Sequence, residues 1–504
     1  MEKTSFEHPA HLKVGAVATN ASSDDEKTAE EVIDVVGLHW SEEEENAVRR
    51  KLDRRIVPVV TILYLLCFID RANIGNARIQ GMAKDLNLVG YRFNWALTMF
   101  YFTYIAVEVP SNIILKRVGP RYWIPFLVLA FGVISMCTAF VKSFTGLMVV
   151  RAFLGLAEGG TMPGIAFFLS CFYKRHELLF RVGIFVSASS MAGAFGGLLA
   201  TGLAHIPRWG TVSAPIHTWR NIFFFEGLLT IFVAACAPLF MPSRPDECTF
   251  LTERQRIIAA ERLVREHQAN PHEMVEARHV KRAIFNINNT VCALGFFLIN
   301  ITVQSFSLFL PTILADLGWT ATRAQLYSVP PYVVACIISI TIAFVSDRTR
   351  LRGIYLATFP ILCIIGFSLL RTSNSPNVKY VAVFFSAAGA FPGGPGFLSW
   401  GLNNAAGPAV RAVTGAYIVS IGSIGAIVAT WTYTSTDGPR YHKGHSINLG
   451  AQAGVAILAS LGIAYIIWEN RKRTRGERDA RLANVTEDER RDLGYRDPAF
   501  KYMP

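Results

Sequence analysis

Four charged side chains lie inside stretches of sequence that are otherwise apolar. Asp70 and Arg71 close the run that begins at Ile56, and Arg151 and Glu158 lie inside a second run. A charged group at membrane depth costs several kcal/mol, so it is rare there unless it has a task. Such residues usually mark the path of a substrate, an ion or a proton, and they make solute movement across a bilayer the first hypothesis.

The first pair could bind an anion and carry a proton. Arg71 has a permanently charged guanidinium that can hold a carboxylate through two parallel hydrogen bonds. Asp70 is its expected partner, because burial disfavours a carboxylate while a neighbouring Arg favours it, and the balance can let the group titrate near the working pH. The alternatives are an Arg71 that reaches to the membrane interface as an anchor, and a static ion pair.

The second pair is spaced by seven residues. Seven residues turn a helix by about 700° and advance it by roughly 10 Å, so Arg151 and Glu158 share a face without touching. We expect each of them to meet a partner on another helix. The alternative for Glu158 is a permanently protonated carboxyl that hydrogen-bonds a neighbouring helix.

The composition is that of a polytopic membrane protein. Of 504 residues, 52% are hydrophobic and only 17% are charged, whereas soluble proteins carry about 25% charged residues. The net charge of +12 comes from short basic clusters between apolar runs, and no nucleic-acid motif occurs, so we expect no nucleic-acid partner. No Walker motif, metal-ligand spacing or nucleophile–His arrangement is present. We therefore expect that the protein uses no ATP, binds no metal or cofactor, and is not an enzyme.

Twelve segments approach the length of about 20 residues that spans a bilayer. They cover residues 56–76, 94–115, 122–140, 145–172, 180–204, 219–241, 285–313, 326–346, 353–370, 378–400, 410–434 and 450–469. A polar stretch with an amphipathic helix separates the first six segments from the last six. The fold class predicted is therefore an all-α membrane protein with two six-helix halves.

The predicted domains follow from this count. They are an acidic N-terminal tail at 1–53, a six-helix bundle at 54–241, a linker with an amphipathic helix at 242–283, a second bundle at 284–470, and a charged tail at 471–504, of which we expect residues 474–504 to be largely disordered. Most loop Lys and Arg lie on the side of the termini, which predicts that both termini are cytoplasmic.

Several motifs in order carry a family resemblance. They are Phe68-Ile-Asp-Arg-Ala-Asn-Ile-Gly-Asn-Ala77, Glu108-Val-Pro-Ser-Asn-Ile-Ile-Leu-Lys-Arg-Val-Gly-Pro-Arg121, Arg151-Ala-Phe-Leu-Gly-Leu-Ala-Glu-Gly-Gly160, Trp400-Gly-Leu-Asn-Asn-Ala-Ala-Gly407 and Asp437-Gly-Pro-Arg-Tyr441. The chain resembles the major facilitator superfamily, its anion:cation symporter family, and the fungal branch of allantoate, nicotinate and pantothenate permeases. The resemblance implies the major facilitator fold and alternating access, with proton-coupled import of a small organic anion. It covers roughly residues 50–470.

The resemblance also implies roles for single residues. Asp70 and Glu158 would carry the coupling proton, Arg71 would hold the substrate carboxylate, and Tyr104 would face the substrate. Second-half candidates for substrate contacts are Gln304, Trp400, Asn403 and Asn404. Charge balance and gating would fall to Arg151, Glu108, Lys116, Arg117, Arg121, Asp347 and Arg348.

Two departures leave the substrate open. Gln304 stands where some animal relatives have a basic residue, and Ser423 stands where the fungal branch often has Asn. One cation fewer favours a singly charged acid such as nicotinate, pantothenate or allantoate. The alternative functions are export of an acidic metabolite by antiport and a transporter-like nutrient sensor. We expect a monomer in the plasma membrane.

Overall fold

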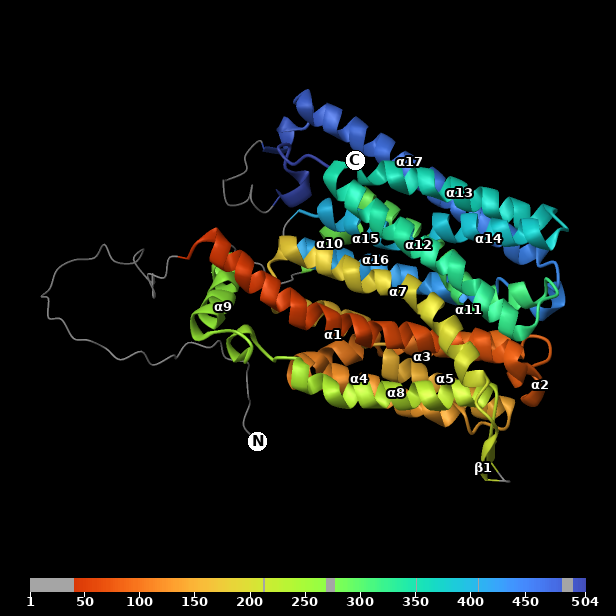
Figure 1. The fold of residues 1–504 in the computed structure, drawn as a ribbon. Coiled ribbons are helices and arrows are strands. Elements are labelled where there is room, and N and C mark those ends of the chain that lie inside the picture. Colours follow the sequence, from red (N-terminus) through yellow and green to blue (C-terminus); the bar gives the residue numbers. More distant parts are fainter. Residues whose placement is uncertain (1–39, 212–213, 269–276, 350, 407, 483–492) are drawn as a thin grey trace, which may run out of the picture.

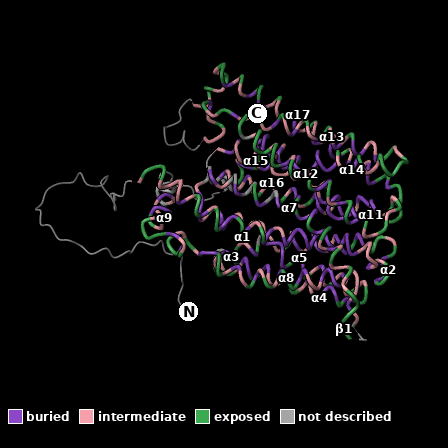
Figure 2. The backbone as a smooth tube through the Cα atoms, viewed as in Figure 1, coloured by how far each residue is buried: buried purple, intermediate pink, exposed green. Residues whose placement is uncertain are grey.

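The computed structural model describes residues 40–211, 214–268, 277–349, 351–406, 408–482 and 493–504. Long helices run back and forth through the molecule and lie roughly parallel to one another (Figure 1). Buried residues follow the sides of the helices that face each other, and exposed ones line the outside (Figure 2). The all-helical fold class predicted from the sequence is confirmed.

The first half of the chain contributes six transmembrane passes. They are α1 (Glu42–Ala77), α3 (Arg92–Val118), α4 (Pro120–Thr138), α5 (Phe144–Glu158) with α6 (Thr161–Ser170), α7 (Arg175–Ala204) and α8 (Trp219–Phe240). Short pieces connect them: η1 (Arg78–Met82), α2 (Ala83–Asp85), and an antiparallel hairpin of β1 (Trp209–Thr211) and β2 (Ala214–Ile216), in which Trp209 pairs with Ile216.

The second half repeats the pattern. Its passes are α11 (Ile287–Ala315), α12 (Ala321–Thr349), α13 (Arg352–Thr372), α14 (Pro376–Ala390) with α15 (Gly393–Asn403), α16 (Pro408–Ala429) and α17 (His442–Thr474). Between the halves lie η2 (Pro245–Glu247), α9 (Glu253–Gln268) and α10 (Ala277–Ile284), and η3 (Ser435–Asp437), η4 (Asp479–Leu482) and η5 (Gly494–Arg496) follow later.

Eight candidate spans among the described helices combine the length and apolarity needed to cross a membrane. The passes made by α7 and α16 contain shorter apolar stretches, Ala188–Ala204 and Val413–Ala429. Large apolar side chains such as Phe102, Phe232 and Leu239 are exposed on the outside, as expected for a surface that lipid covers.

Glycines allow the helices of the first half to pack closely. A Cβ atom at Gly155 or Gly159 would overlap the backbone of α3, at Phe100 and Tyr104. Small residues at such contacts let two helix backbones approach each other within a membrane. This packing fixes the end of α5, where Glu158 lies, against the middle of α3.

We call the end of the bundle that carries α2 and the β1–β2 hairpin the far face. Here the two halves are joined by neutral polar contacts. Asn94 donates to the carbonyls of Thr430 (2.6 Å) and Tyr433 (3.1 Å), and Gln80 donates to Gln325 (2.9 Å). Close packing of α1 on α11, where a Cβ at Gly75 would overlap the Leu308 backbone, adds to this closure.

We call the opposite end, which carries α9 and the start of α1, the tail face (Figure 1). The helix α9 is held there against the first half by ion pairs. Arg262 is 1% exposed, lies 3.4 Å from Glu177 and donates to the Phe172 carbonyl at 2.6 Å, while Arg254 pairs with Glu44. The amphipathic helix expected near this position therefore packs on protein.

The end of the C-terminal tail is ordered, contrary to our expectation of a largely disordered segment. Arg473 of α17 donates to the backbone carbonyls of Tyr495 (2.9 Å) and Asp497 (3.2 Å) and to that of Phe500. Tyr502 is buried and exchanges two backbone hydrogen bonds with the Asn470 amide. One buried guanidinium that binds several carbonyls thus folds the tail back onto α17.

Candidate functional site

A cavity of about 90 Å³ lies between the two halves. Helices α1, α3, α6 and α7 line it from the first half, and α11, α15 and α16 line it from the second. The lining residues are Tyr64, Phe68, Arg71, Tyr101, Tyr104, Met162, Ser189, Phe296, Ile299, Asn300, Val303, Gln304, Phe391, Gly394, Pro395, Val419, Ser423 and Ala426. Arg71 is the one fully charged side chain in this wall.

Arg71 is held by a carboxylate from another helix. Its Nε atom donates to Oε1 of Glu158 at 2.6 Å, and Glu158 is completely buried. The guanidinium carbon lies 4.8 Å from the ring centres of Phe68 and Tyr104 and 5.4 Å from that of Phe100. The aromatic faces favour the cation, and the ion pair offsets the cost of burying it.

Asp70 has a different partner from the one expected. Its carboxylate accepts a hydrogen bond from the Ser135 hydroxyl of α4, and among the cations Arg151 influences it more strongly than Arg71. Successive residues on a helix point about 100° apart, so Asp70 faces α4 while Arg71 faces the cavity. The expectation that Asp70 pairs with Arg71 is wrong, and Glu158 takes that place.

Glu226 of α8 was missed in the sequence. It is 5% exposed, and neither carboxylate oxygen has a hydrogen-bond partner among the described residues. Asp70 and Glu226 repel each other electrostatically. Glu226 could have been found in the sequence in the same way as Glu158, because it is a lone acid inside an apolar run, residues 219–240.

Arg151 completes this cluster. Its guanidinium carbon lies 5.9 Å from the ring centre of Phe223, which is on α8 one turn before Glu226, and residues three apart on a helix share a face. Two of its nitrogens, Nε and Nη2, have no hydrogen-bond partner among the described residues. Arg151 is thus placed between Asp70 and the acid-bearing face of α8.

The charges of this cluster do not cancel when every group is ionised. The three carboxylates of Asp70, Glu158 and Glu226 face the two guanidiniums of Arg71 and Arg151, and all five residues are less than 10% exposed. Three negative and two positive charges leave a net charge of −1. One added proton would make the cluster neutral. Binding of that proton is favoured, because an uncompensated buried charge is costly.

Two other predicted contact residues lie at the cavity. Tyr104 lines it on the first half, and Gln304 lines it on the second, where its side-chain oxygen accepts a hydrogen bond from the Tyr101 hydroxyl at 2.8 Å. Tyr101 and Asn300 are cavity residues that sequence reasoning did not single out. They provide further donors and acceptors for a polar ligand.

Trp400, Asn403 and Asn404 lie away from this cavity, near the tail face. The Trp400 indole N–H and the Asn404 amide both donate to the Met503 carbonyl at 3.0 Å, and the Met503 N–H donates back to Asn404 at 2.7 Å. In this conformation Trp400 and Asn404 hold the C-terminal segment, and the role of all three residues as substrate contacts stays a prediction.

The residues predicted to act in gating are spread over the first and second halves. Glu108 is half-buried in the middle of α3, Arg117 is exposed near the end of that helix, and Arg348 is exposed near the end of α12. Arg121 lines a groove of about 270 Å³ with Arg55. The side chains of Lys116 and Asp347 are outside the part that the structure describes.

A bundle of two membrane-spanning halves around a charged central cavity defines a solute transporter. The chain belongs to the Major Facilitator Superfamily, whose family profile matches residues 60–430. It is a transporter of that superfamily and not an enzyme, as predicted.

Curated relatives of the chain include fungal transporters. The chain is 33% identical to MFS-type transporter efuF of Hormonema carpetanum over 437 residues, which cover 85% of this chain and 87% of that protein. It is 30% identical to the high-affinity nicotinic acid transporter of Saccharomyces cerevisiae over 461 residues, covering 91% and 85%. The predicted likeness to a fungal branch that includes nicotinate permeases is confirmed.

Solved structures show the same fold. A bacterial homologue of the human lysosomal transporter Spinster, inward-facing and occupied, gives a TM-score of 0.59 at 16% identity, covering 84% of this chain and 97% of that one. The inward-open xylose transporter XylE of E. coli gives 0.60 at 14% identity, covering 79% and 94%.

Proposed function

We propose that this transporter imports a small organic monocarboxylate together with a proton. The observation that carries the proposal is the 2.6 Å ion pair between Arg71 and Glu158. Arg71 lines the central cavity, whereas Glu158 lies behind it and is fully buried. One guanidinium is therefore within reach of both an internal carboxylate and a ligand.

The pair suggests how anion and proton are coupled. A substrate carboxylate that enters the cavity competes with Glu158 for Arg71, because both accept the same kind of charge-assisted hydrogen bond. Protonation of Glu158 would remove its charge and release the guanidinium to the substrate. The proton and the anion then bind together, and the occupied site gains no net charge in a region of low dielectric constant.

The neighbouring charges give the proton alternative positions. Asp70 and Glu226 lie close enough to influence each other, and Arg151 interacts with both Asp70 and Glu158. A proton that Glu158 binds while the site is open to one side of the membrane can leave through Asp70 while the site is open to the other. This is possible because the cluster as a whole needs only one bound proton to be neutral.

The closed far face supports alternating access by movement of one half against the other. If the tail face is cytoplasmic, as the distribution of basic residues predicts, this conformation faces inward. Import would require the Asn94 and Gln80 contacts to break and the tail-side portions of the halves to close. Rocking around a site between two repeats is the usual movement in such transporters.

The central cavity favours a small ring-bearing or amide-bearing acid. Phe296 and Phe391 offer aromatic faces, while Gln304 and Asn300 offer amides opposite Arg71. The similarity to a nicotinic acid transporter makes nicotinate the first substrate to test, before pantothenate and allantoate.

Uptake of the three labelled acids by transporter-null cells that express the chain tests this proposal. Each is measured at acidic and neutral external pH, with and without a protonophore. Uptake that rises in acid and collapses with the protonophore supports symport. Absence of uptake by protein at the cell surface, with loss of preloaded acid instead, would overturn import and indicate export.

A further inference from the structure

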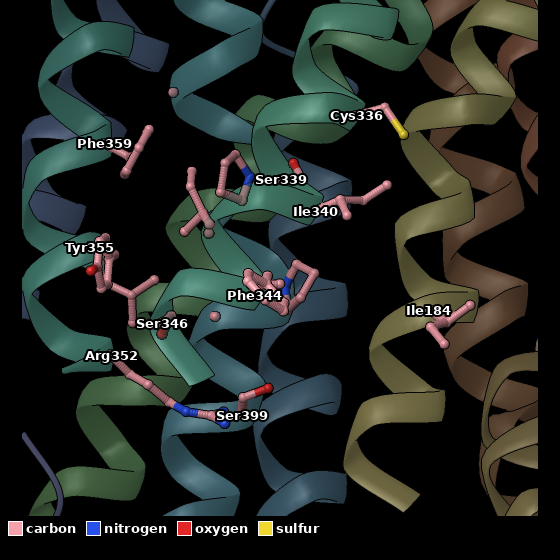
Figure 3. A pocket seen from close by; sticks show the side chains of 18 of the residues that line it. Ile184, Cys336, Ser339, Ile340, Phe344, Ser346, Arg352, Tyr355, Phe359 and Ser399 are labelled. Atoms are coloured by element: carbon pink, nitrogen blue, oxygen red, sulfur yellow. The ribbon is translucent and has the colours of Figure 1, made fainter. Parts of the chain in front are cut away.

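Two hollows lie on the tail side of the central cavity. The larger one, of about 430 Å³, shares Pro395 with that cavity and has Ile184 of α7 and Ile340 of α12 on opposite sides (Figure 3). Since α7 belongs to the first half and α12 to the second, this space continues the route of the solute. The smaller one is the groove of about 270 Å³ with Arg55 and Arg121 in its wall, and it lies outside that route.

The groove lies where three helices of the first half meet the linker, at the tail face. Arg55 is on the tail-side part of α1, Arg121 is in the first turn of α4, and Leu239 and Phe240 end α8. The rest of the wall comes from the segment after α8, with Met241, Pro242, Glu247, Thr249 and Phe250. The second half contributes no described residue to this wall, so a ligand bound here is separate from the transported solute.

The two cations of the groove lack a counter-ion. Arg55 is exposed and Arg121 is half-buried, and neither forms an ion pair with a residue that the structure describes. The guanidinium carbon of Arg121 lies 5.7 Å from the ring centre of Tyr122, a contact that favours the cation without neutralising it. Its Nε atom is buried without a hydrogen-bond partner among the described residues, whereas buried donors normally have one. A negatively charged acceptor would suit both arginines.

One carboxylate limits the positive charge of the groove. Glu247 is exposed and lines the same wall as the two arginines. Two guanidiniums and one carboxylate leave a net charge of +1, which a ligand with a single negative charge compensates. The Glu247 carboxylate and the Thr249 hydroxyl can accept hydrogen bonds from hydroxyl groups. The groove therefore suits a singly charged anion that carries hydroxyls near its charge.

Apolar side chains at the groove indicate that this anion belongs to a lipid. Leu239 is 79% exposed and Phe240 is 52% exposed. They end α8, which is long and apolar enough to cross a membrane, so they lie near the level at which acyl chains meet headgroups. A soluble anion would leave both side chains uncovered, whereas a phospholipid meets the cations with its phosphate and the apolar side chains with its acyl chains.

We propose that this groove binds an anionic phospholipid with a hydroxylated headgroup. The phosphodiester binds Arg55 and Arg121, the headgroup hydroxyls donate to Glu247 and Thr249, and the acyl chains cover Leu239 and Phe240. The planar guanidinium matches the geometry of phosphate oxygens. If the tail face is cytoplasmic, as the basic residues predict, the groove meets the leaflet that carries anionic lipid. The site stands whether or not the chain couples transport to protons.

The test uses the full-length chain in nanodiscs of phosphatidylcholine with a small fraction of phosphatidylglycerol that carries a photoreactive diazirine near its headgroup. Cross-linked peptides are mapped by mass spectrometry, and apparent affinities come from competition with unlabelled phosphatidylglycerol. Cross-links should concentrate at the end of α8 and in residues 241–250. An even distribution over the lipid-facing helices would overturn the site.

Variants separate a built site from general attraction to the membrane surface. Arg55→Gln alters an exposed side chain and should weaken the binding of phosphatidylglycerol about 5-fold, and the double variant with Arg121→Gln should weaken it about 10-fold or more. Arg54→Gln is the matched control, because Arg54 is exposed next to Arg55 but does not line the groove. It should change the affinity less than about 2-fold. Equal losses in Arg54→Gln and Arg55→Gln would refute the proposal.

Competitors identify the ligand class. Phosphatidylmethanol has the same charge as phosphatidylglycerol but no headgroup hydroxyls, so it should compete less well, and Glu247→Ala should remove the difference. Phosphatidylethanolamine, which has no net charge, should compete poorly. Competition by glycerol 3-phosphate as effective as that by phosphatidylglycerol would assign the groove to a soluble phosphate and overturn the lipid. Because uptake is not measured, failure here and failure of proton-coupled import are distinguishable.

Discussion

Replacing Glu158 with Gln should separate substrate binding from proton coupling. The amide keeps the size of the side chain but carries no charge, as a protonated Glu158 would. Arg71 then loses the 2.6 Å charge-assisted bond that competes with the substrate. A hydrogen bond to a charged group contributes about 1.5–3 kcal/mol, so anion affinity at neutral pH should rise by about 10- to 150-fold.

The measurement has two parts. Substrate binding to the purified variant is titrated between acidic and neutral pH, and proteoliposomes are assayed for exchange and for accumulation driven by a proton gradient. The variant should bind with little dependence on pH and should exchange substrate, but it should not accumulate it. The unaltered chain should bind better in acid.

A control variant makes the result specific. Glu108→Gln alters a half-buried acid on α3 that interacts with Arg71 electrostatically but has no hydrogen bond to it among those described, so it should change affinity less than Glu158→Gln and leave most of the pH dependence of binding in place. Weaker binding by Glu158→Gln, with the pH dependence of the unaltered chain, would refute competition for Arg71.

Four further substitutions have definite expected outcomes. Arg71→Lys keeps the charge but loses the planar fork and its ring contacts, so the KM for uptake should rise by about 10-fold, and an unchanged KM would argue against carboxylate binding there. Glu226→Gln removes one negative charge from the cluster and makes protonation harder, so half-maximal uptake should move to more acidic pH in a pH series. Trp400→Ala should lower stability by about 3–5 kcal/mol, seen as a lower melting temperature in detergent, because this fully buried ring holds the C-terminal segment. Arg262→Met should release α9 and expose it to limited proteolysis, since the Glu177 partner is lost.

The architecture could be predicted because its cause is local. A bilayer requires spans of fixed length, so hydropathy along the chain gives the passes and the division into two halves. The same reasoning identified Arg71, Glu158 and Asp70, since a charge inside an apolar run stands out. What periodicity cannot give is the helix opposite each charge, and so Glu158 rather than Asp70 proved to be the partner of Arg71.

The second-half residues show the other limit. Trp400, Asn403 and Asn404 read as polar groups in a span, but three of their hydrogen bonds go to the backbone of Met503, at the end of the chain. Backbone carbonyls exist at every residue and leave no trace in a sequence. The docking of the tail on Arg473 was hidden for the same reason.

The contacts that join the halves at the far face have a consequence for the effect of salt. Asn94 and Gln80 bind their partners across the halves as neutral groups, whereas the ion pairs of α9 and of Arg71 with Glu158 lie within the first half. Salt screens interactions between exposed charges but has little effect on hydrogen bonds between neutral groups. These hydrogen bonds should therefore hold the far face closed to a similar extent in dilute and saline media, and among the described residues only the electrostatic attraction between Arg78 and Asp316 adds a part that salt could weaken.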